Sequence, residues 1–204
     1  PLNLDQAQKF YKKIKDRLAE HSRAPESMKI MPGLSPIVGR TLEEAKEKQA
    51  YLDGLTSPIV AKEILSFVLG GVDLSEFELD DPMPEVKPTS TSGQSIINHV
   101  MDIARKSNLS LRETAQVVAG ARGKFALIGT PKSIADTMEE WFVTWGCDGF
   151  NIMPPYLPGS LRDFTTLVIP ELQRRKLFRE EYEGQTLREH LGLMHPSARK
   201  PIAT

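Results

Sequence analysis

The stretch FALIGTPKSIADTMEEWFVTWGCDGFNIM, residues 125–153, decides the fold class. It opens with a short apolar run at residues 125–128 and turns at Thr130-Pro131. Apolar residues then recur with helical spacing over residues 134–145, and a second apolar run follows at residues 149–153. A threonine before a proline is a typical start of a helix, and a glycine after the last turn is a typical stop. The pattern predicts a strand, a helix and a parallel strand with a right-handed connection.

The same order of elements occurs earlier in the chain. Residues 28–31 are apolar and predict a short buried strand, with an irregular continuation over residues 34–39. Thr41 and Glu44 have the spacing of a capping box, and residues 42–52 are rich in helix-forming Glu, Ala and Lys. The sequence therefore predicts a second strand–helix unit here, and three strands in all.

Helices account for most of the remaining chain. An amphipathic helix opens it after Asn3, and a helix from Ser57-Pro58 carries so broad an apolar face that we expect it to be well buried. Further helices are predicted at residues 94–106, at 111–118 after a Ser110/Glu113 capping box, and at 161–177. Three strand–helix units cannot close an eight-stranded barrel, which needs about 250 residues.

Composition narrows the classes of function. The chain has 204 residues, of which 40% are hydrophobic, and this is enough for a folded core. Its 26 basic and 27 acidic residues nearly cancel, so we expect a small-molecule or protein partner and no nucleic acid or membrane. Cys147 is the single cysteine, which excludes an intramolecular disulfide, and the four histidines lack the spacing of a metal site. No run approaches the roughly 20 apolar residues of a membrane span. We expect a cytoplasmic protein without a metal.

Four runs together resemble one family of flavoenzymes. They are KIMPGLSPIVGRTLEEAKEK at residues 29–48, GTPxxIAD at 129–136, GFNxMPPYLPG at 149–159 and VIPELQRRxLFRxEYEGxTLREHLGL at 168–193. On these motifs the chain resembles the carboxyl-terminal half of the nitrilotriacetate and dibenzothiophene-sulfone monooxygenases, which are bacterial-luciferase-like, FMN-dependent enzymes. The resemblance extends over essentially the whole chain and keeps the order of the motifs.

The resemblance implies an α/β fold, namely the carboxyl-terminal portion of a luciferase-like TIM barrel that is incomplete on its own. It would comprise about three strand–helix units, strands six to eight, with a helical insertion. Residues 1–204 would then form a single partial (β/α) barrel domain. Residues 72–93 would be a loop excursion within the insertion, and residues 194–204 a frayed tail.

The resemblance also implies a two-component monooxygenase. Reduced FMN, supplied by a separate NAD(P)H-dependent flavin reductase, would react with O2, and one oxygen atom would enter a small organic substrate. The cofactor carries this chemistry, while the protein positions it and excludes water. Most of the family's FMN-binding residues would lie upstream of this chain.

Candidate site residues follow from the rule that a barrel's active site lies at the carboxyl ends of its strands. The amide of Asn151 could reach the flavin or the substrate, or it could satisfy a nearby backbone group. Met153 and Tyr156 are candidates for the substrate pocket, because the proline-rich loop at residues 154–159 restricts the backbone there. The alternatives for these positions are ordinary packing and a plain loop.

Arg122 is a candidate for binding the cofactor. It lies in the Gly-Ala-Arg-Gly-Lys run at residues 120–124, where glycines expose backbone amides to an anion. The run lacks the spacing of a known phosphate loop, and a helix stop with basic residues is the favoured explanation of it. By resemblance, Lys124 stands where many family members have a histidine. No catalytic residue can be assigned from the sequence.

Two other interpretations stay open at this level. The chain could be a non-catalytic truncated remnant that acts as an interaction or scaffold piece, on a missing amino-terminal half or as a homo-oligomer. Three parallel strands with open edges would favour such association. It could also be a small α/β binding domain unrelated to flavin, which requires the three strands to pair with one another and to bury both faces.

Overall fold

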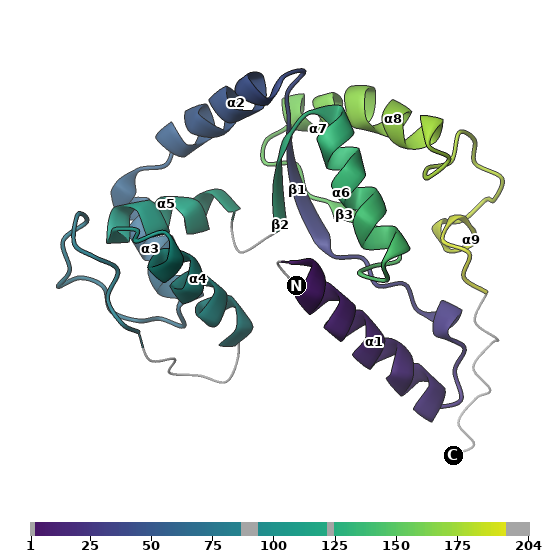
Figure 1. The fold of residues 1–204 in the computed structure, drawn as a ribbon, viewed down its shortest axis with the longest axis horizontal. Coiled ribbons are helices and arrows are strands. Elements are labelled where there is room, and N and C mark those ends of the chain that lie inside the picture. The colour runs from purple at the N-terminus through teal and green to yellow at the C-terminus, as the bar shows by residue number, and fades with distance from the viewer. Residues whose placement is uncertain (1–2, 87–93, 122–124, 195–204) are drawn as a thin grey trace, which may run out of the picture.

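The computed structural model describes residues 3–86, 94–121 and 125–194 (Figure 1). Its centre is a sheet of three parallel strands, β1 (Gly33–Val38), β2 (Phe125–Gly129) and β3 (Asn151–Ile152). The predicted parallel α/β arrangement is confirmed. The strand order is β2-β1-β3, so β1 is central, whereas consecutive barrel strands would place β2 in the middle. The connection from β2 to β3 runs through helix α6 (Pro131–Val143), which passes over β1 (Figure 1).

Prolines explain why β3 is so short. The carbonyl of Leu34 accepts a hydrogen bond from the Met153 N–H at 2.8 Å, so even-numbered residues of β1 direct their peptide groups toward β3. The next such residue is Pro36, and the residue whose N–H would donate to its carbonyl is Pro155. Neither proline has an N–H to donate, and the ladder therefore ends. This is why β3 has two residues rather than the five predicted for residues 149–153.

The placement of the first strand was wrong. Residues 28–31 form no strand, and Met28 and Met31 are 38% and 39% exposed. The strand is instead the segment that was expected to be irregular. At residues 28–31, side chains rather than a neighbouring strand bind backbone groups. Lys15 donates to the Met28 carbonyl at 2.8 Å, and the Ile30 N–H donates to Asp148 at 2.8 Å.

Helices cover one face of the sheet. These are α6 and a continuous helical stretch made of α7 (Gly159–Asp163), the π-helix η2 (Phe164–Val168) and α8 (Ile169–Arg174). Their apolar side chains pack in one cluster with the covered face of β1; its buried members are Val38, Ile134, Ala135, Phe164, Val168 and Leu172. A second cluster includes Trp141, which stacks on Phe125 with ring centroids 4.3 Å apart.

The π segment accounts for a proline inside the last long helix. The Ile169 N–H donates to the carbonyl of Phe164, five residues back. Pro170 has no N–H, and its ring would crowd the carbonyl four residues earlier in a regular helix. A wider turn before it relieves that conflict. The helix predicted at residues 161–177 is therefore observed, although with a π turn and an earlier end.

Helix α1 (Leu4–Glu20) is fixed to the sheet by the Asp148 cluster, which consists of Tyr11, Lys15, Ile30 and Asp148. Asp148 accepts from the Tyr11 hydroxyl at 2.9 Å and from the Ile30 N–H at 2.8 Å, and it pairs with Lys15 at 2.9 Å. Burial raises the pKa of Tyr11 to about 12, and the hydrogen bond to Asp148 adds to the shift. The cluster ties α1 to the segments that precede β1 and β3. A short 3-10 helix, η1 (Pro25–Ser27), lies between α1 and β1.

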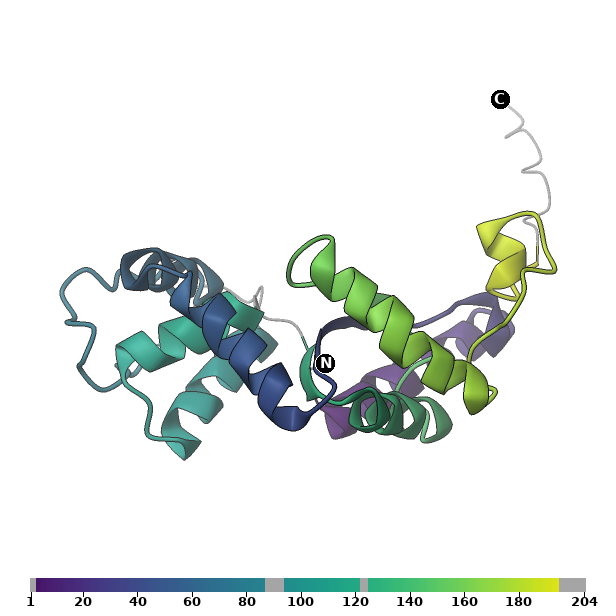
Figure 2. The ribbon, with the colours of Figure 1, turned by 90° about the horizontal axis from the view of Figure 1, so that it is seen from above.

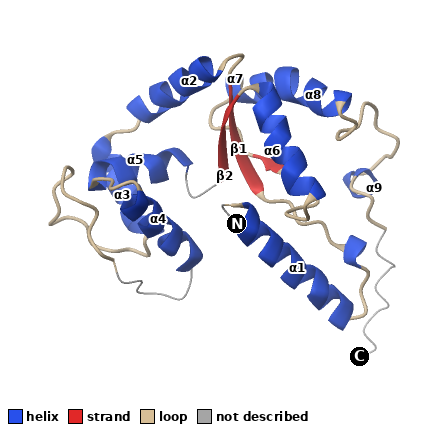
Figure 3. Cartoon of the chain, in the orientation of Figure 1, coloured by secondary structure: helices blue, strands red, loops and turns tan. Residues whose placement is uncertain are grey.

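The remaining helices form a separate packing unit beside the sheet. Helix α2 (Leu42–Gly54) leads from β1 to α3 (Pro58–Val68), α4 (Gln94–Lys106) and α5 (Leu111–Ala121). We call residues 57–86 and 94–121 the helical lobe, and the sheet with α1 and α6–α8 the sheet lobe. Figures 1 and 2 show the two lobes at opposite ends of the molecule, and Figure 3 shows that all three strands belong to one of them.

The expectation that α3 is well buried was wrong. Only one stripe of the helix is covered: Ala61 and Leu65 are fully buried, whereas Ile59 and Phe67 are 71% and 82% exposed. The apolar face of the helix is wider than the area that its neighbours cover. α3 packs chiefly on α5, and no other helix of the described chain lies over its outer side.

Residues 72–86, which we call the strap, cross the helical lobe without forming a helix. One cation from each of three helices holds the strap: Lys62 donates to the Phe77 carbonyl at 2.6 Å, Arg105 pairs with Glu85 at 2.7 Å, and Arg112 pairs with Asp80 at 2.8 Å. Leu74 is inserted into the core of the lobe and is 3% exposed.

The predicted caps are present. Thr130 caps α6, and Ser110 and Glu113 form the reciprocal bonds that open α5. Thr41 caps α2, but the Glu44 carboxylate accepts from the Arg40 N–H rather than from that of Thr41. Near the end of the described chain, a capping box opens the short helix α9 (Leu187–His190). Among the described helices, none has the length and apolar content to cross a bilayer.

Candidate functional site

The two faces of the sheet differ in what covers them. Side chains alternate along a strand, and Leu34, Pro36 and Val38 of β1 face the helices. Ser35 and Ile37 face the other way, as do their partners Ala126 and Ile128 on β2. We call this second side the inner face. It is the face that would point into the barrel in the fold implied by the resemblance.

A cavity of ≈ 390 Å³ lies on the inner face. One wall is the sheet, and the other is formed by the end of α2 and by α5. The residues that line it are Ser35, Ile37, Gln49, Leu52, Asp53, Leu55, Thr56, Val117, Ala119, Ala126, Ile128, Met153, Pro154 and Pro155. Most of this lining is apolar, and the volume falls in the range of about 300–1,000 Å³ that small-molecule sites occupy.

The polar part of the lining is concentrated on α2. The Gln49 amide donates to Asp53 Oδ1 at 2.5 Å, and both side chains are half-buried. Burial raises the pKa of the Asp53 carboxyl, and the hydrogen bond from Gln49 partly opposes the shift. Lysine and arginine are absent from the described lining. The cavity therefore combines apolar walls with one acidic, hydrogen-bonded corner.

Lys48 holds α2 at the carboxyl end of β1. Its ammonium donates to the Val38 carbonyl at 2.9 Å and pairs with Glu44 at 2.8 Å and Asp163 at 2.9 Å. Burial disfavours the charged form of Lys48, but the hydrogen bonds to Glu44 and Asp163 outweigh it and raise its pKa. This contact fixes the start of the helix whose last turn carries Asp53.

The sequence-predicted site residues are only partly brought together. Met153 lines the cavity, and its sulfur lies 2.7 Å from the place where a Cβ on Gly33 would stand, so a larger residue at position 33 would displace the Met153 side chain. Asn151 is exposed on the inner face, beside Gly33 in the sheet, but it does not line the cavity. Tyr156 packs against Gly159, outside the cavity lining. Arg122 and Lys124 lie outside the described residues.

Gln49 and Asp53 were not found from the sequence. Gln49 lies inside the helix predicted at residues 42–52 and Asp53 directly follows it, but that helix was noted only for its helix-forming residues. A usable signal exists: the two polar residues are four positions apart on the same stripe as Leu52, where a helix that packs on a sheet is expected to be apolar.

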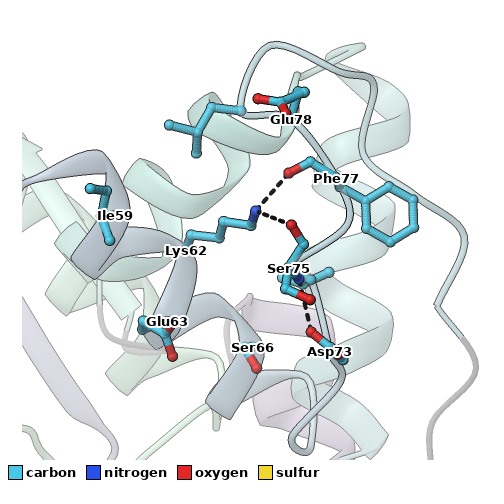
Figure 4. Close-up of a pocket in the computed structure, with 10 residues that line it drawn as sticks. Ile59, Lys62, Glu63, Ser66, Asp73, Ser75, Phe77 and Glu78 are labelled. Carbon is cyan, nitrogen blue, oxygen red and sulfur yellow. Dashed lines mark hydrogen bonds between the residues drawn. The ribbon is translucent and has the colours of Figure 1, made fainter.

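A second cavity, of ≈ 350 Å³, lies between α3 and the strap (Figure 4). Figure 4 shows Lys62 reaching across it toward the backbone of Ser75 and Phe77, and Ser75 donating to Asp73. The ammonium is thus already bound by two carbonyls, and Glu63 and Glu78 on the rim are exposed. This cavity is explained by the attachment of the strap.

Three cations line a shallow groove on the other side of the sheet, at the start of α6. Lys132 pairs with Asp136 at 2.9 Å and Arg174 with Glu171 at 2.7 Å, so two of the three are already engaged, and Arg40 is the third. The groove shares no described lining residue with the inner-face cavity. A molecule held in the cavity is therefore not in contact with these cations.

The fold agrees with the comparisons with known proteins. Residues 1–149 match the family of luciferase-like monooxygenases, and the chain belongs to this family. It is 45% identical over 194 residues to nitrilotriacetate monooxygenase component A of Aminobacter aminovorans, covering 94% of this chain and 43% of that protein. It is 46% identical over 195 residues to N-acetyl-S-(2-succino)cysteine monooxygenase of Bacillus subtilis, covering 95% and 44%.

A solved structure gives the same result for the fold. DmoA from Hyphomicrobium sulfonivorans superposes with a TM-score of 0.80 at 23% identity, over 94% of this chain and 40% of that one. The predicted membership and the partial luciferase-like fold are thus confirmed. The chain spans less than half the length of the relatives that it matches.

Proposed function

We propose that this chain is the carboxyl-terminal part of a two-component, FMN-dependent monooxygenase, and that its inner-face cavity forms part of the wall around a small organic substrate. The observation that carries the proposal is the 45% identity to nitrilotriacetate monooxygenase component A over 94% of the chain. The position of the cavity adds support, because Met153, Pro154 and Pro155 follow β3 at its carboxyl end.

The described residues fit the isoalloxazine ring of FMN better than its phosphate. An isoalloxazine ring or an organic substrate needs apolar walls with a few polar groups, and Ile37, Leu52 and Ile128 provide such walls. A phosphate needs cations or a set of backbone N–H groups. The described lining offers an acid, Asp53, and no cation. We therefore assign the phosphate no site among these residues and derive no reaction step from this chain alone.

The remaining parts of the proposal follow from the family. A separate flavin reductase supplies reduced FMN, and O2 is the second substrate. The cytoplasmic location rests instead on the composition of the chain, with its single cysteine. Asn151 and Met153 stay candidates for contacts with the ring or the substrate, since both lie on the inner face. Arg122 stays the candidate for a phosphate contact and Tyr156 for the substrate mouth.

A flavin titration tests the proposal. Riboflavin and FMN are added to the purified chain, oxidised and then photoreduced without oxygen, and flavin fluorescence is followed after light scattering has established the mass of the protein. We expect saturable micromolar binding of both flavins. The described cavity offers the phosphate no cation, so a preference for FMN would come from a residue beyond the described lining, for which Arg122 is the candidate. If a well-dispersed chain binds neither flavin, the proposed role in the flavin cavity is wrong, and the non-catalytic interpretation takes its place.

An Arg122→Ala variant separates the two parts of the site. A preference for FMN over riboflavin that disappears in this variant would place the phosphate at Arg122. Equal binding of both flavins by both proteins would remove Arg122 from the site.

A further inference from the structure

Asp53 is the single ionisable residue in the described lining of the inner-face cavity. It lies in the last turn of α2, with Leu52 and Thr56 beside it in the lining. Its Oδ1 accepts from Gln49 at 2.5 Å. The described residues provide neither a hydrogen bond nor an ion pair to its second oxygen, Oδ2. A half-buried carboxylate thus has one oxygen free to accept a hydrogen bond inside a mostly apolar cavity.

The stability of the helix does not explain an acid at this position. The carboxyl end of a helix carries partial negative charge, so an aspartate in the last turn is unfavourable there. α2 has two acids in its first turn, where they are favourable, and no basic residue in its last turn that would compensate Asp53. Burial next to Leu52 disfavours the charge further, which agrees with the raised pKa. Asp53 is costly to the fold unless a ligand uses it.

We propose that Asp53 binds the amino group of a small organic amine, with its carboxylate oriented by Gln49, and that Ile37, Ile128 and Met153 contact the apolar body of this ligand. The inference rests on the proposed function, since the amine would be the class of substrate that the monooxygenase takes. The attraction between a carboxylate and an ammonium group favours such a ligand. The same charge repels a carboxylate, and no lysine or arginine of the described lining offsets that repulsion.

Three ring compounds of nearly equal size test the charge preference: benzylamine, benzyl alcohol and benzoate. Each is titrated into the full chain labelled at the methyl groups of isoleucine and methionine, and the methyl resonances are followed by NMR. We expect benzylamine to shift the methyls of Ile37, Ile128 and Met153 in a saturable way. The methyl of Ile134, which is buried on the covered face, reports whether the fold is intact.

Charge selectivity is the decisive quantity. Benzylamine should bind at least about tenfold more tightly than benzoate, with benzyl alcohol between them; tenfold corresponds to about 1.4 kcal/mol. Asp53→Asn keeps the shape and removes the charge, so it should weaken benzylamine about tenfold and leave benzyl alcohol nearly unchanged. Glu47→Gln removes an equal charge from an exposed position on the same helix and should change nothing.

Several outcomes would overturn the inference. These are benzoate binding as tightly as benzylamine, equal loss of benzylamine affinity in Glu47→Gln and Asp53→Asn, or shifts confined to methyls outside the cavity. The test uses no flavin and is independent of the flavin titration. Flavin binding without amine selectivity would reject the Asp53 site alone, whereas amine selectivity without flavin binding would keep the site and reject its role in a monooxygenase.

Discussion

The helical lobe and the sheet lobe bury their apolar residues in different ways. The helical lobe closes one core of eleven buried residues drawn from α3, α4, α5 and the strap. In the sheet lobe, the described core is divided into clusters of six and three buried residues. The larger of these packs between the covered face and the helices, while Ala126 and Ile128 on the inner face of β2 are exposed. The helical lobe thus has one continuous core, whereas the sheet lobe divides its core and keeps the inner face of β2 available to a ligand or to further chain.

The ion pairs of the two lobes also differ in how far they are exposed to solvent. In the helical lobe, the pairs that hold the strap are exposed: Arg105 and Glu85 are 57% and 76% exposed. In the sheet lobe, Lys15 and Asp148 are 12% and 16% exposed. Exposed pairs contribute little to stability, whereas breaking a largely buried pair leaves a charge without a partner. The sheet lobe therefore depends on specific polar contacts, and the helical lobe depends on apolar area.

The largest expected effect is in the covered core of the sheet lobe. Trp141→Ala removes a side chain that is 2% exposed and stacked on Phe125, and we expect a loss of about 3–5 kcal/mol in the free energy of unfolding. Trp145→Ala is the matched control, because Trp145 lies just after the same helix and is 68% exposed. Urea unfolding measures both. Similar losses for the two variants would show that the described packing of α6 is wrong.

The next test asks whether the two lobes unfold separately. Leu65→Ala makes a cavity in the core of the helical lobe, with an expected cost of about 2–5 kcal/mol, and Phe67→Ala on the exposed side of the same helix should cost far less. Hydrogen exchange locates the damage. Since the lobe has its own core, the amides of α3, α4 and α5 should lose protection while those of β1 and α6 keep theirs. Equal loss in both lobes would show a single cooperative unit.

A polar contact of the sheet lobe comes third. Asp148→Asn weakens the bonds to Tyr11 and Ile30 and removes the carboxylate that pairs with Lys15, so we expect a loss of about 2–3 kcal/mol. The pKa of Tyr11 should fall from about 12 toward its ordinary value of 10.0, because the carboxylate that helps to raise it is gone. Asp16→Asn, in an exposed pair with Lys12, is the control. An unchanged absorbance titration of Tyr11 would contradict the described geometry.

The sequence predicted the elements whose signals are local. The caps at Thr130 and Ser110 and the parallel arrangement follow from residue type and spacing. The position of β1 could not be predicted in this way, because a proline such as Pro36 normally indicates the end of a strand. Only the structure shows that Pro36 lies beyond the part of β1 that pairs with β3. Ile59 and Phe67, two of the exposed apolar residues of α3, show the same limit. A wide apolar stripe predicts burial, but which neighbours are present decides how much of it is covered.

The candidate site was predictable only in part for the same reason. Met153 could be found because it follows a strand in a region where a barrel's site is expected. Asp53 lies at the end of a helix whose sequence stands out only for its helix-forming residues. It enters the cavity because Lys48 holds that helix to the Val38 carbonyl and to Asp163, which is far away in the sequence.

The smallest effect concerns pH and again compares the lobes. Arg175 binds Glu171, Asp136 and Glu139 and ties α8 to α6. Hydrogen bonds from Arg174 and Arg175 lower the pKa of Glu171 to about 2, from an ordinary value of 4.5. A lowered folded-state pKa stabilises the protein above the unfolded-state value, and this stabilisation is lost as the pH falls toward 2. Arg175→Met should therefore be less stable than wild type at neutral pH, and the difference should shrink in acid.

Arg112→Met is the matched variant in the helical lobe. It removes the arginine that lowers the pKa of Asp80 through an exposed hydrogen bond. Because solvent screens that pair, its stability should remain close to that of wild type at every pH. Urea unfolding of the three proteins between about pH 7 and pH 2.5 decides the matter. If the difference in unfolding free energy between Arg175→Met and wild type stays constant with pH, Arg175 acts through packing alone. If Arg112→Met shows a pH-dependent difference as large as that of Arg175→Met, the ion pairs of the two lobes are not distinct.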